Sequence, residues 1–419
     1  MKEMFRIEDT LTNKISYYHI MAFMVCLPFN DFYSEMVLAS FILHELIHFK
    51  KEKFSGFRFL VLLSALIYVI TFASAFYSSD KDQMIVDLGK QLGLLIFPLV
   101  FSITSLNLAT YRFRLMKAFG LSMLVIIIYL YFDAFNIIRY NHLPLSTLMT
   151  TAFINHNFSL PLNLHATYLA MYVTVAAAVF LQVIVTSHKW RQRLLYTIGL
   201  LILMTAIVQL SSKAVFIAAL VIFYLAAFFL IHRYRNRWKF ITVSFVLSLL
   251  AIAGLTKSVQ FKTRFIQGLK QDLTKSSYNV NVVEPRLVRW QAAWPLVKQS
   301  PVIGHGTGSE VSLLKEEYFQ KKLFISYLNQ LNAHNQYLSF LIRSGIIGLA
   351  VFLFVLGVGF KQAFTLKDYI FCSFLIVVSV VSLSENILDV NKGIFFFGFF
   401  YPFFMRREPS STYTPLPAN

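Results

Sequence analysis

Two arginines and an imidazole stand out in the last third of the sequence. Arg286 and Trp290 are four residues apart, so they share one face of an expected amphipathic helix, and Arg289 lies next to that face. His334 follows, paired with Asn335, where an apolar run begins. Guanidinium groups bind anions and stabilise developing negative charge, and an imidazole exchanges protons near neutral pH. These residues predict a site that binds an anion and moves a proton, although a single His at such an edge is more often structural.

Further candidates lie in and around the same region. The stretch 304–308 reads Gly-His-Gly-Thr-Gly, and its backbone N–H groups could approach a ligand closely. Glycine turns are common, however, and His305 is a weaker candidate for a base. Arg264 and Lys213 add two cations. Tyr337, like the tryptophan at position 290, could stack on a substrate ring, although packing is the more common role.

The composition places these residues in a membrane protein. The 419 residues are 57% hydrophobic and 14% charged, with a mean hydropathy of +0.62, whereas soluble domains carry about 25% charged residues. The net charge of +18 would suggest nucleic acid in a soluble protein. Here the basic residues cluster between apolar runs, so membrane topology explains them better than nucleic acid. Cys26 and Cys372 have no zinc, redox or disulfide spacing.

The apolar runs predict about twelve membrane spans, at roughly 20 residues per crossing. A tight hairpin through Asn30 and Asp31 is expected between the first two. The expected spans lie near residues 16–29, 33–49, 58–77, 85–106, 114–135, 163–186, 194–210, 213–232, 239–256, 334–359, 367–385 and 391–405.

Orientation follows from lysine and arginine. Alternate connections are basic, at 50–58, 112–117, 189–193, 233–239 and 361–367. The positive-inside rule puts these connections and both termini in the cytoplasm. The outer connection 137–162 is expected to be a loop with a short interfacial helix. The predicted layout is nine transmembrane helices in 1–256, a periplasmic loop at 257–333, three more in 334–405, and a cytoplasmic tail at 406–419.

Charge gathers on the predicted outer side. Residues 257–331 hold 11 Lys and Arg against 5 Asp and Glu, which fits either a solvated loop or an anion-binding cap. Arg343, Glu385 and Asp389 also fall toward the outer parts of their apolar runs. Such one-sided charge favours a cavity open to the outer surface over the midplane site of a transporter. For Asp87 taken alone, snorkelling at a helix end is the preferred interpretation.

Four motifs in order carry a resemblance to a known family. They are Arg286-x-x-x-Trp290, Pro301-x-x-Gly304-x-Gly306, His334-Asn335-x-x-Leu338 and Gly345-x-x-Gly348, with Arg264 upstream and Ser384-Glu385-Asn386 downstream. This series resembles the O-antigen ligase and O-antigen polymerase superfamily, most strongly over about 200–400. One position departs from the family pattern, because Ser212-Lys213 stands where the family has Ser-Arg. A lysine keeps the charge but loses the planar bidentate fork.

The resemblance implies an all-α polytopic membrane protein with a large helical periplasmic loop and a GT-C-like glycosyltransferase architecture. It implies inverting transfer of a glycan, the O-antigen, from undecaprenyl diphosphate to a lipid A–core acceptor at the periplasmic face of the bacterial inner membrane. No metal or cofactor is expected. The residues agree, because the sequence has no Gly-x-x-x-x-Gly-Lys loop and no dense carboxylate cluster, so the energy must come with the substrate.

The resemblance also suggests roles for single residues. The leaving diphosphate would be bound by Arg264, Arg286, Arg289 and Lys213. His334 would take the proton of the acceptor hydroxyl, and His165 is a weaker candidate for that base. Other substrate contacts would come from Asn335, Trp290, His305 and Tyr337.

The acceptor stays open at this point. A polymerase would use a second lipid-linked repeat unit, and a protein-directed transferase would use a hydroxyl side chain. The moderate length, without an added soluble domain, favours the ligase. A non-enzymatic alternative is a glycan or lipid transporter, for which substrate movement would survive His334→Ala.

Overall fold

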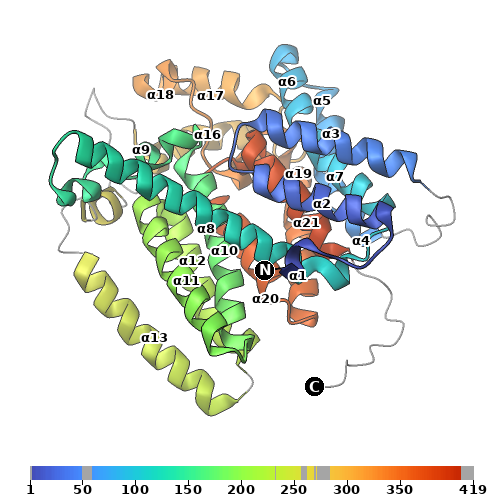
Figure 1. The fold of residues 1–419 in the computed structure, drawn as a ribbon. Helices are drawn as coiled ribbons and strands as arrows, with labels where there is room; N and C mark the ends of the chain where they lie inside the picture. The colour runs from blue at the N-terminus through green and yellow to red at the C-terminus, as the bar shows by residue number, and fades with distance from the viewer. Residues whose placement is uncertain are drawn as a thin grey trace.

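The protein is helical throughout its described parts. The computed structural model describes residues 2–49, 59–231, 233–255, 262–268, 270 and 284–406, and no strand occurs among them. Figure 1 shows the arrangement. The helices of the main body are α1 (Lys2–Phe5), α2 (Leu11–Cys26), α3 (Asp31–Ile47), α4 (Phe59–Leu62), α5 (Ala65–Ala75), α6 (Lys81–Gln91), α7 (Gly93–Ile103), α8 (Leu108–Tyr140), α10 (Ala166–Thr186), α11 (Trp190–Leu210), α12 (Lys213–Leu230), α13 (Tyr234–Leu255), α19 (Gln336–Thr365), α20 (Tyr369–Val381) and α21 (Asn391–Met405).

Six helices of the described chain are long and apolar enough to cross a membrane. They are Lys81–Ile103, in which α6 and α7 count as one continuous helical segment, Leu108–Tyr140, Ala166–Thr186, Trp190–Leu210, Lys213–Leu230 and Gln336–Thr365. Each predicted span coincides with one helix or with two consecutive helices. Several are short, however: α2 has 16 residues, α3 has 17 and α21 has 15. Length and composition thus support six spans, and the larger number stays a prediction.

Helices α10 and α21 lie in the interior of the bundle. α10 is buried on nearly all its faces and packs against α8, α11, α12 and α20. α21 is buried from Lys392 to Met405, with its phenylalanines against α7 and α20. A helix that is apolar on every side is typical of such a central position.

The first two long helices form the predicted hairpin. The side chain of Asn30 accepts a hydrogen bond from the N–H of Phe32 and caps α3. The next residue, Asp31, lies 2.8 Å from the ammonium group of Lys392, at the start of α21. A capped turn and an ion pair therefore fix this hairpin to the central helix.

A helical cap covers the beginning of α19. It consists of α16 (Arg286–Gln299), α17 (Ser309–Gln320) and α18 (Phe324–Leu328). Figure 1 shows these three helices together on one side of the bundle. Their small core contains Ala293, Leu296, Leu314 and Tyr318, and it continues onto Ile342 of α19. The cap is thus joined to a candidate membrane helix by apolar packing.

The other predicted outer connection contains several short helices. They are η2 (Leu145–Met149), η3 (Thr151–Phe153), α9 (His156–Ser159) and η4 (Leu160–Leu162). The amide of Gln209, at the end of α11, donates to the carbonyls of Leu148 and Phe153. The expected short helix is therefore present in this connection, and Gln209 anchors the connection to α11.

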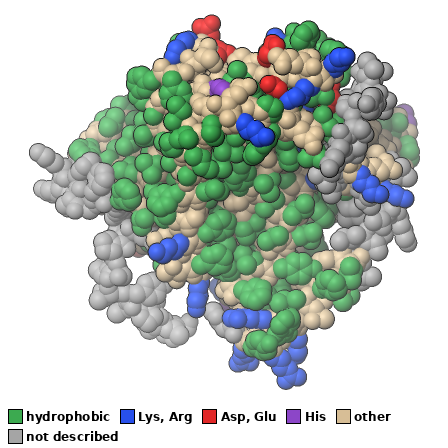
Figure 2. All heavy atoms as spheres, turned by 180° about the vertical axis from the view of Figure 1, so that it is seen from behind, with side chains coloured by type: hydrophobic (Ala, Val, Ile, Leu, Met, Phe, Trp, Pro, Cys, Tyr) green, Lys and Arg blue, Asp and Glu red, His purple; other side chains and the backbone are tan. Residues whose placement is uncertain are grey.

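Surface charge is distributed unevenly. Figure 2 shows hydrophobic side chains over the middle of the visible face, Lys and Arg at its lower end, and both signs of charge at its upper end. The apolar middle fits a region in contact with lipid.

Candidate functional site

Arg286 is the first residue of α16, which is the helix that the spacing of Arg286 and Trp290 predicted. The carboxylate of Glu284, just before it, accepts hydrogen bonds from the N–H groups of Ile325 and Ser326, at 3.0 and 2.9 Å. This buried carboxylate ties the start of α16 to α18. The position of Arg286 is therefore fixed by the fold of the cap.

His334 lies in the turn that leads into α19. Its backbone is in the left-handed region, with φ of 46°, a conformation that costs a non-glycine residue about 1 kcal/mol or more. The N–H of His334 donates to the side chain of Asn332 at 3.0 Å. Asn335 caps α19 by accepting from the N–H groups of Tyr337 and Leu338. These contacts hold His334 just before the N-terminus of α19.

Glu385 joins these two predicted residues. It lies in the turn after α20, and its Oε2 atom is 3.1 Å from Nδ1 of His334. Its Oε1 atom is 3.4 Å from Nη2 of Arg286. The side chains of Arg286, His334 and Glu385 are 26%, 29% and 17% exposed. A guanidinium and an imidazole thus contact the same carboxylate, and all three side chains remain partly exposed.

The electrostatics of Glu385 reflect these neighbours. Burial raises its pKa, but the hydrogen bond and charge of His334, followed by the charges of Arg286 and His165, outweigh burial. The net result is a lowered pKa. Glu385 is therefore ionised at neutral pH and acts as a hydrogen-bond acceptor only.

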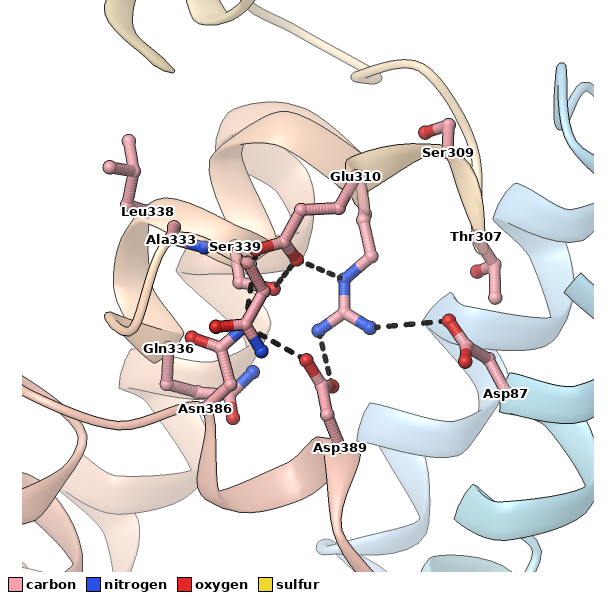
Figure 3. A network of polar contacts seen from close by, with 12 residues as sticks. Asp87, Thr307, Ser309, Glu310, Ala333, Gln336, Leu338, Ser339, Asn386 and Asp389 are labelled. Carbon is pink, nitrogen blue, oxygen red and sulfur yellow. Dashed lines mark hydrogen bonds and ion pairs between the residues drawn. The ribbon is translucent and has the colours of Figure 1, made fainter. Parts of the chain in front are cut away.

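A second charged cluster lies beside the first, around the buried guanidinium of Arg343 (Figure 3). Asp389 is 2.8 Å away, Glu310 3.5 Å and Asp87 3.8 Å. Three carboxylates from α6, α17 and the turn before α21 thus converge on one arginine of α19. The preferred interpretation of Asp87 as a snorkelling side chain is wrong, because its carboxylate pairs with Arg343 instead of reaching for solvent.

Glu310 is the centre of the hydrogen bonds in this cluster. One carboxylate oxygen accepts from the N–H of Ala333 at 3.0 Å and from the amide of Asn386 at 3.1 Å. The other accepts from the hydroxyl of Ser339 and faces Arg343. Figure 3 shows Glu310, Ala333, Ser339 and Asn386 drawn together. Glu310 therefore fixes the residue that precedes His334.

The turn that carries His334 is also held from its other side. The indole N–H of Trp290 donates to the carbonyl of Ala333 at 2.9 Å. The N–H of Asn335 donates to the side chain of Asn386 at 2.8 Å. Since α16 carries both Arg286 and Trp290, the Arg-x-x-x-Trp motif brings a cation to the site and supports the turn of His334 at once.

The glycine-rich turn approaches α19 closely. The N–H groups of His305 and Gly306 donate to the carbonyls of Ile342 and Arg343, both at 2.8 Å. Gly345 interrupts α19 with φ of 61°, and a Cβ atom there would lie 2.2 Å from the carbonyl oxygen of Val302. These glycines let two backbones touch. The expectation that these N–H groups could approach a ligand is therefore wrong, because those of His305 and Gly306 bind backbone carbonyls of α19.

Several candidates for substrate contacts have internal partners. Nε2 of His305 lies 2.8 Å from the carbonyl oxygen of Leu296. The hydroxyl of Tyr337 donates to the carbonyl of Ser379 at 2.9 Å. Together with the capping bond of Asn335 and the indole bond of Trp290, these contacts give the four residues clear roles in positioning the backbone.

The remaining predicted cations lie in two places. Arg289 is buried, and its charge acts on Tyr318 of α17. Lys213 is the first residue of α12, and its ammonium nitrogen lies 3.1 Å from the position of a Cβ atom on Gly268. The backbone of Arg264 belongs to the short helix η5 (Lys262–Gln267), but its side chain lies outside the described residues.

Near the site, Glu310, Asp389 and Asp87 pair with Arg343, and Glu385 pairs with Arg286 and His334. Across the described ranges, no group of three or more His, Cys, Asp or Glu side chains is placed to hold a metal ion.

The fold and the site together define a class: an all-helical protein with several membrane-length apolar helices and a cluster of arginine, histidine and glutamate at one end of the bundle. The family model for O-Antigen ligase matches residues 198–353. This confirms the resemblance to the O-antigen ligase and polymerase superfamily. The matched segment contains Arg286, Trp290 and His334, whereas Glu385 lies beyond it. No curated protein matches the chain significantly.

Proposed function

We propose that this protein is a membrane glycosyltransferase of the O-antigen ligase type. It transfers a glycan from undecaprenyl diphosphate to lipid A–core. The observation that best supports this proposal is the contact of Arg286 and His334 with the same carboxylate. An anion-binding group and a proton acceptor are needed together when a diphosphate leaves and a hydroxyl attacks.

The proposed topology has twelve spans, a GT-C-like architecture and both termini in the cytoplasm. Residues 1–256 carry nine spans, 257–333 the periplasmic loop, 334–405 three spans and 406–419 the tail. The basic cluster at 361–367 supports this orientation, because it lies at the opposite end of α19 from His334. The active site then faces the periplasm.

Cations stabilise the leaving group in the proposed mechanism. Negative charge grows on the diphosphate oxygen as its bond to the anomeric carbon breaks, and the guanidinium of Arg286 is proposed to bind that charge. Arg264 and Lys213 are proposed as further cations for the diphosphate. Arg289 is included with a supporting role, since its side chain is buried.

His334 provides the proton acceptor. The acceptor hydroxyl loses its proton to the imidazole as its oxygen attacks the anomeric carbon. Attack opposite the leaving diphosphate inverts the configuration at that carbon. Asn335, Trp290, His305 and Tyr337 are proposed to shape the binding site, through the contacts that hold the turn and the cap.

Reconstitution tests this function. Purified protein in proteoliposomes would receive the undecaprenyl-diphosphate glycan and, separately, lipid A–core or a second lipid-linked repeat unit, with products separated by size. We expect a single transfer onto lipid A–core, also in the presence of EDTA. A ladder on undecaprenyl diphosphate would instead assign the protein as a polymerase.

The matched controls keep the fold and change a distant residue of the same type. His142, exposed in the other outer connection, is the control for His334→Ala. Arg139, exposed in the last turn of α8, is the control for Arg286→Ala. Full transfer activity in both site variants would contradict the proposed function.

A further inference from the structure

Glu385 contacts both Arg286 and His334, and the proposed mechanism gives it no role. It lies outside the segment matched by the family model, yet it contacts both residues. Its two oxygens are divided between them, with Oε2 toward His334 and Oε1 toward Arg286.

We propose that Glu385 is the positioning residue of the active site, which orients His334 so that Nε2 faces the acceptor and holds Arg286 beside it. This inference rests on the proposed function. It assigns to Glu385 the role of holding the base, His334, and the cation, Arg286, beside each other.

The orientation of the imidazole follows from hydrogen-bond chemistry. An ionised carboxylate can only accept, so Nδ1 of His334 must carry the hydrogen that points to Oε2 of Glu385. In the neutral ring, the lone pair is then on Nε2. Nε2 is therefore the atom that takes the proton of the acceptor hydroxyl.

The step balances with these groups alone. The acceptor oxygen forms a bond to the anomeric carbon, and its proton moves to Nε2 of His334. The bond from that carbon to the diphosphate oxygen breaks, and the electron pair leaves with the diphosphate beside Arg286. The imidazolium that results keeps its Nδ1–H bond to Glu385, whose negative charge stabilises it.

The same carboxylate also holds Arg286, whose Nη2 atom lies 3.4 Å from Oε1 of Glu385. A guanidinium presents its N–H donors in a fixed planar fork, so this contact sets the orientation of the whole cationic group. His165, just before α10, helps to lower the pKa of Glu385. The charge of Glu385 in turn acts on Tyr168 of α10.

The test compares Glu385→Gln, Glu385→Asp and the control Glu316→Gln, which changes an exposed carboxylate of α17. A glutamine can turn its amide N–H toward Nδ1 and stabilise the wrong tautomer. We expect kcat to fall by about 10²–10⁴-fold, as in other carboxylate–histidine pairs, with KM for both substrates changed less than about threefold. Aspartate should recover at least about tenfold over glutamine, and the control should match the wild type.

The pH profile separates orientation from mere stability. Without the negative charge, the imidazolium is less stable, so the acidic limb of the kcat profile should move to lower pH in Glu385→Gln. Wild-type kcat and an unshifted limb in Glu385→Gln, with His334→Ala inactive, would overturn this inference and leave the proposed function intact. Equal loss in the Gln and Asp variants would also overturn it. Activity in His334→Ala and Arg286→Ala would instead overturn the function.

Discussion

Two charged clusters share the turn between α20 and α21, and they are built in opposite ways. The side chains of Arg286, His334 and Glu385 are partly exposed and meet at a single carboxylate, whereas Arg343 is 5% exposed and faces three carboxylates. The first is accessible to a substrate. The second is buried and ties α6, α17 and α19 together. The difference distinguishes the proposed site of chemistry from the scaffold that positions it.

Loss of Arg343 should have the largest effect. Arg343→Met leaves Glu310, Asp389 and Asp87 without their cation in a buried place, which costs about 3–5 kcal/mol. We expect a large drop in the melting temperature of the purified protein or a failure to accumulate in membranes. If Arg343→Met kept the melting temperature of the wild type, the cluster around Arg343 would not be the scaffold, and the distinction between the two clusters would fail.

Loss of His334 should remove activity and keep the fold. His334→Ala deletes the proposed base, which contributes about 10²–10⁴-fold to rate. The transfer rate should fall by that factor, while the melting temperature changes little because the imidazole is only half-buried. Size-exclusion and thermal-shift measurements serve as the fold control. Unfolding of this variant would place His334 in the scaffold.

Arg286→Ala should slow transfer somewhat less. Removal of one preorganised group that stabilises developing charge costs about 10²–10³-fold, and Arg286→Lys should recover part of the loss as a point charge. Donor titrations of kcat and KM would measure both. An unchanged rate would exclude the diphosphate role.

Trp290→Phe tests the link between the clusters. The variant keeps the aromatic ring and loses the bond to the carbonyl of Ala333, which is worth about 1 kcal/mol. Transfer should fall a few-fold, because the turn of His334 loosens. A loss as large as that of His334→Ala would give Trp290 a direct role with the substrate.

The smallest effect is the order of protonation on acidification. Burial raises the pKa of Glu310, although Arg343 lowers it, whereas the pKa of Glu385 is lowered. As pH falls, Glu310 should therefore take up a proton before Glu385. Infrared difference spectra of the carboxyl band, assigned with Glu310→Gln and Glu385→Gln, would measure this order. Earlier protonation of Glu385 would reverse the comparison.

The sequence predicted the parts of the site that depend on local spacing. The helix from Arg286, the turn at His334 and the gathering of charge at one end of the bundle all follow from local patterns. Glu310 was missed, because its partners at Ala333 and Asn386 are far away in sequence. The glycine turn was assigned to a ligand for the same reason, since nothing local indicates that it packs against Gly345.

The central claim is that Arg286 and His334 act together on one substrate. A double-mutant cycle measures it most directly, with transfer rates for Arg286→Ala, His334→Ala and the double variant in the same proteoliposomes. Residues that act as a unit give strongly non-additive losses, so the double variant should be about as slow as the slower single variant. Losses that multiply would show that the two residues act independently and would contradict the account.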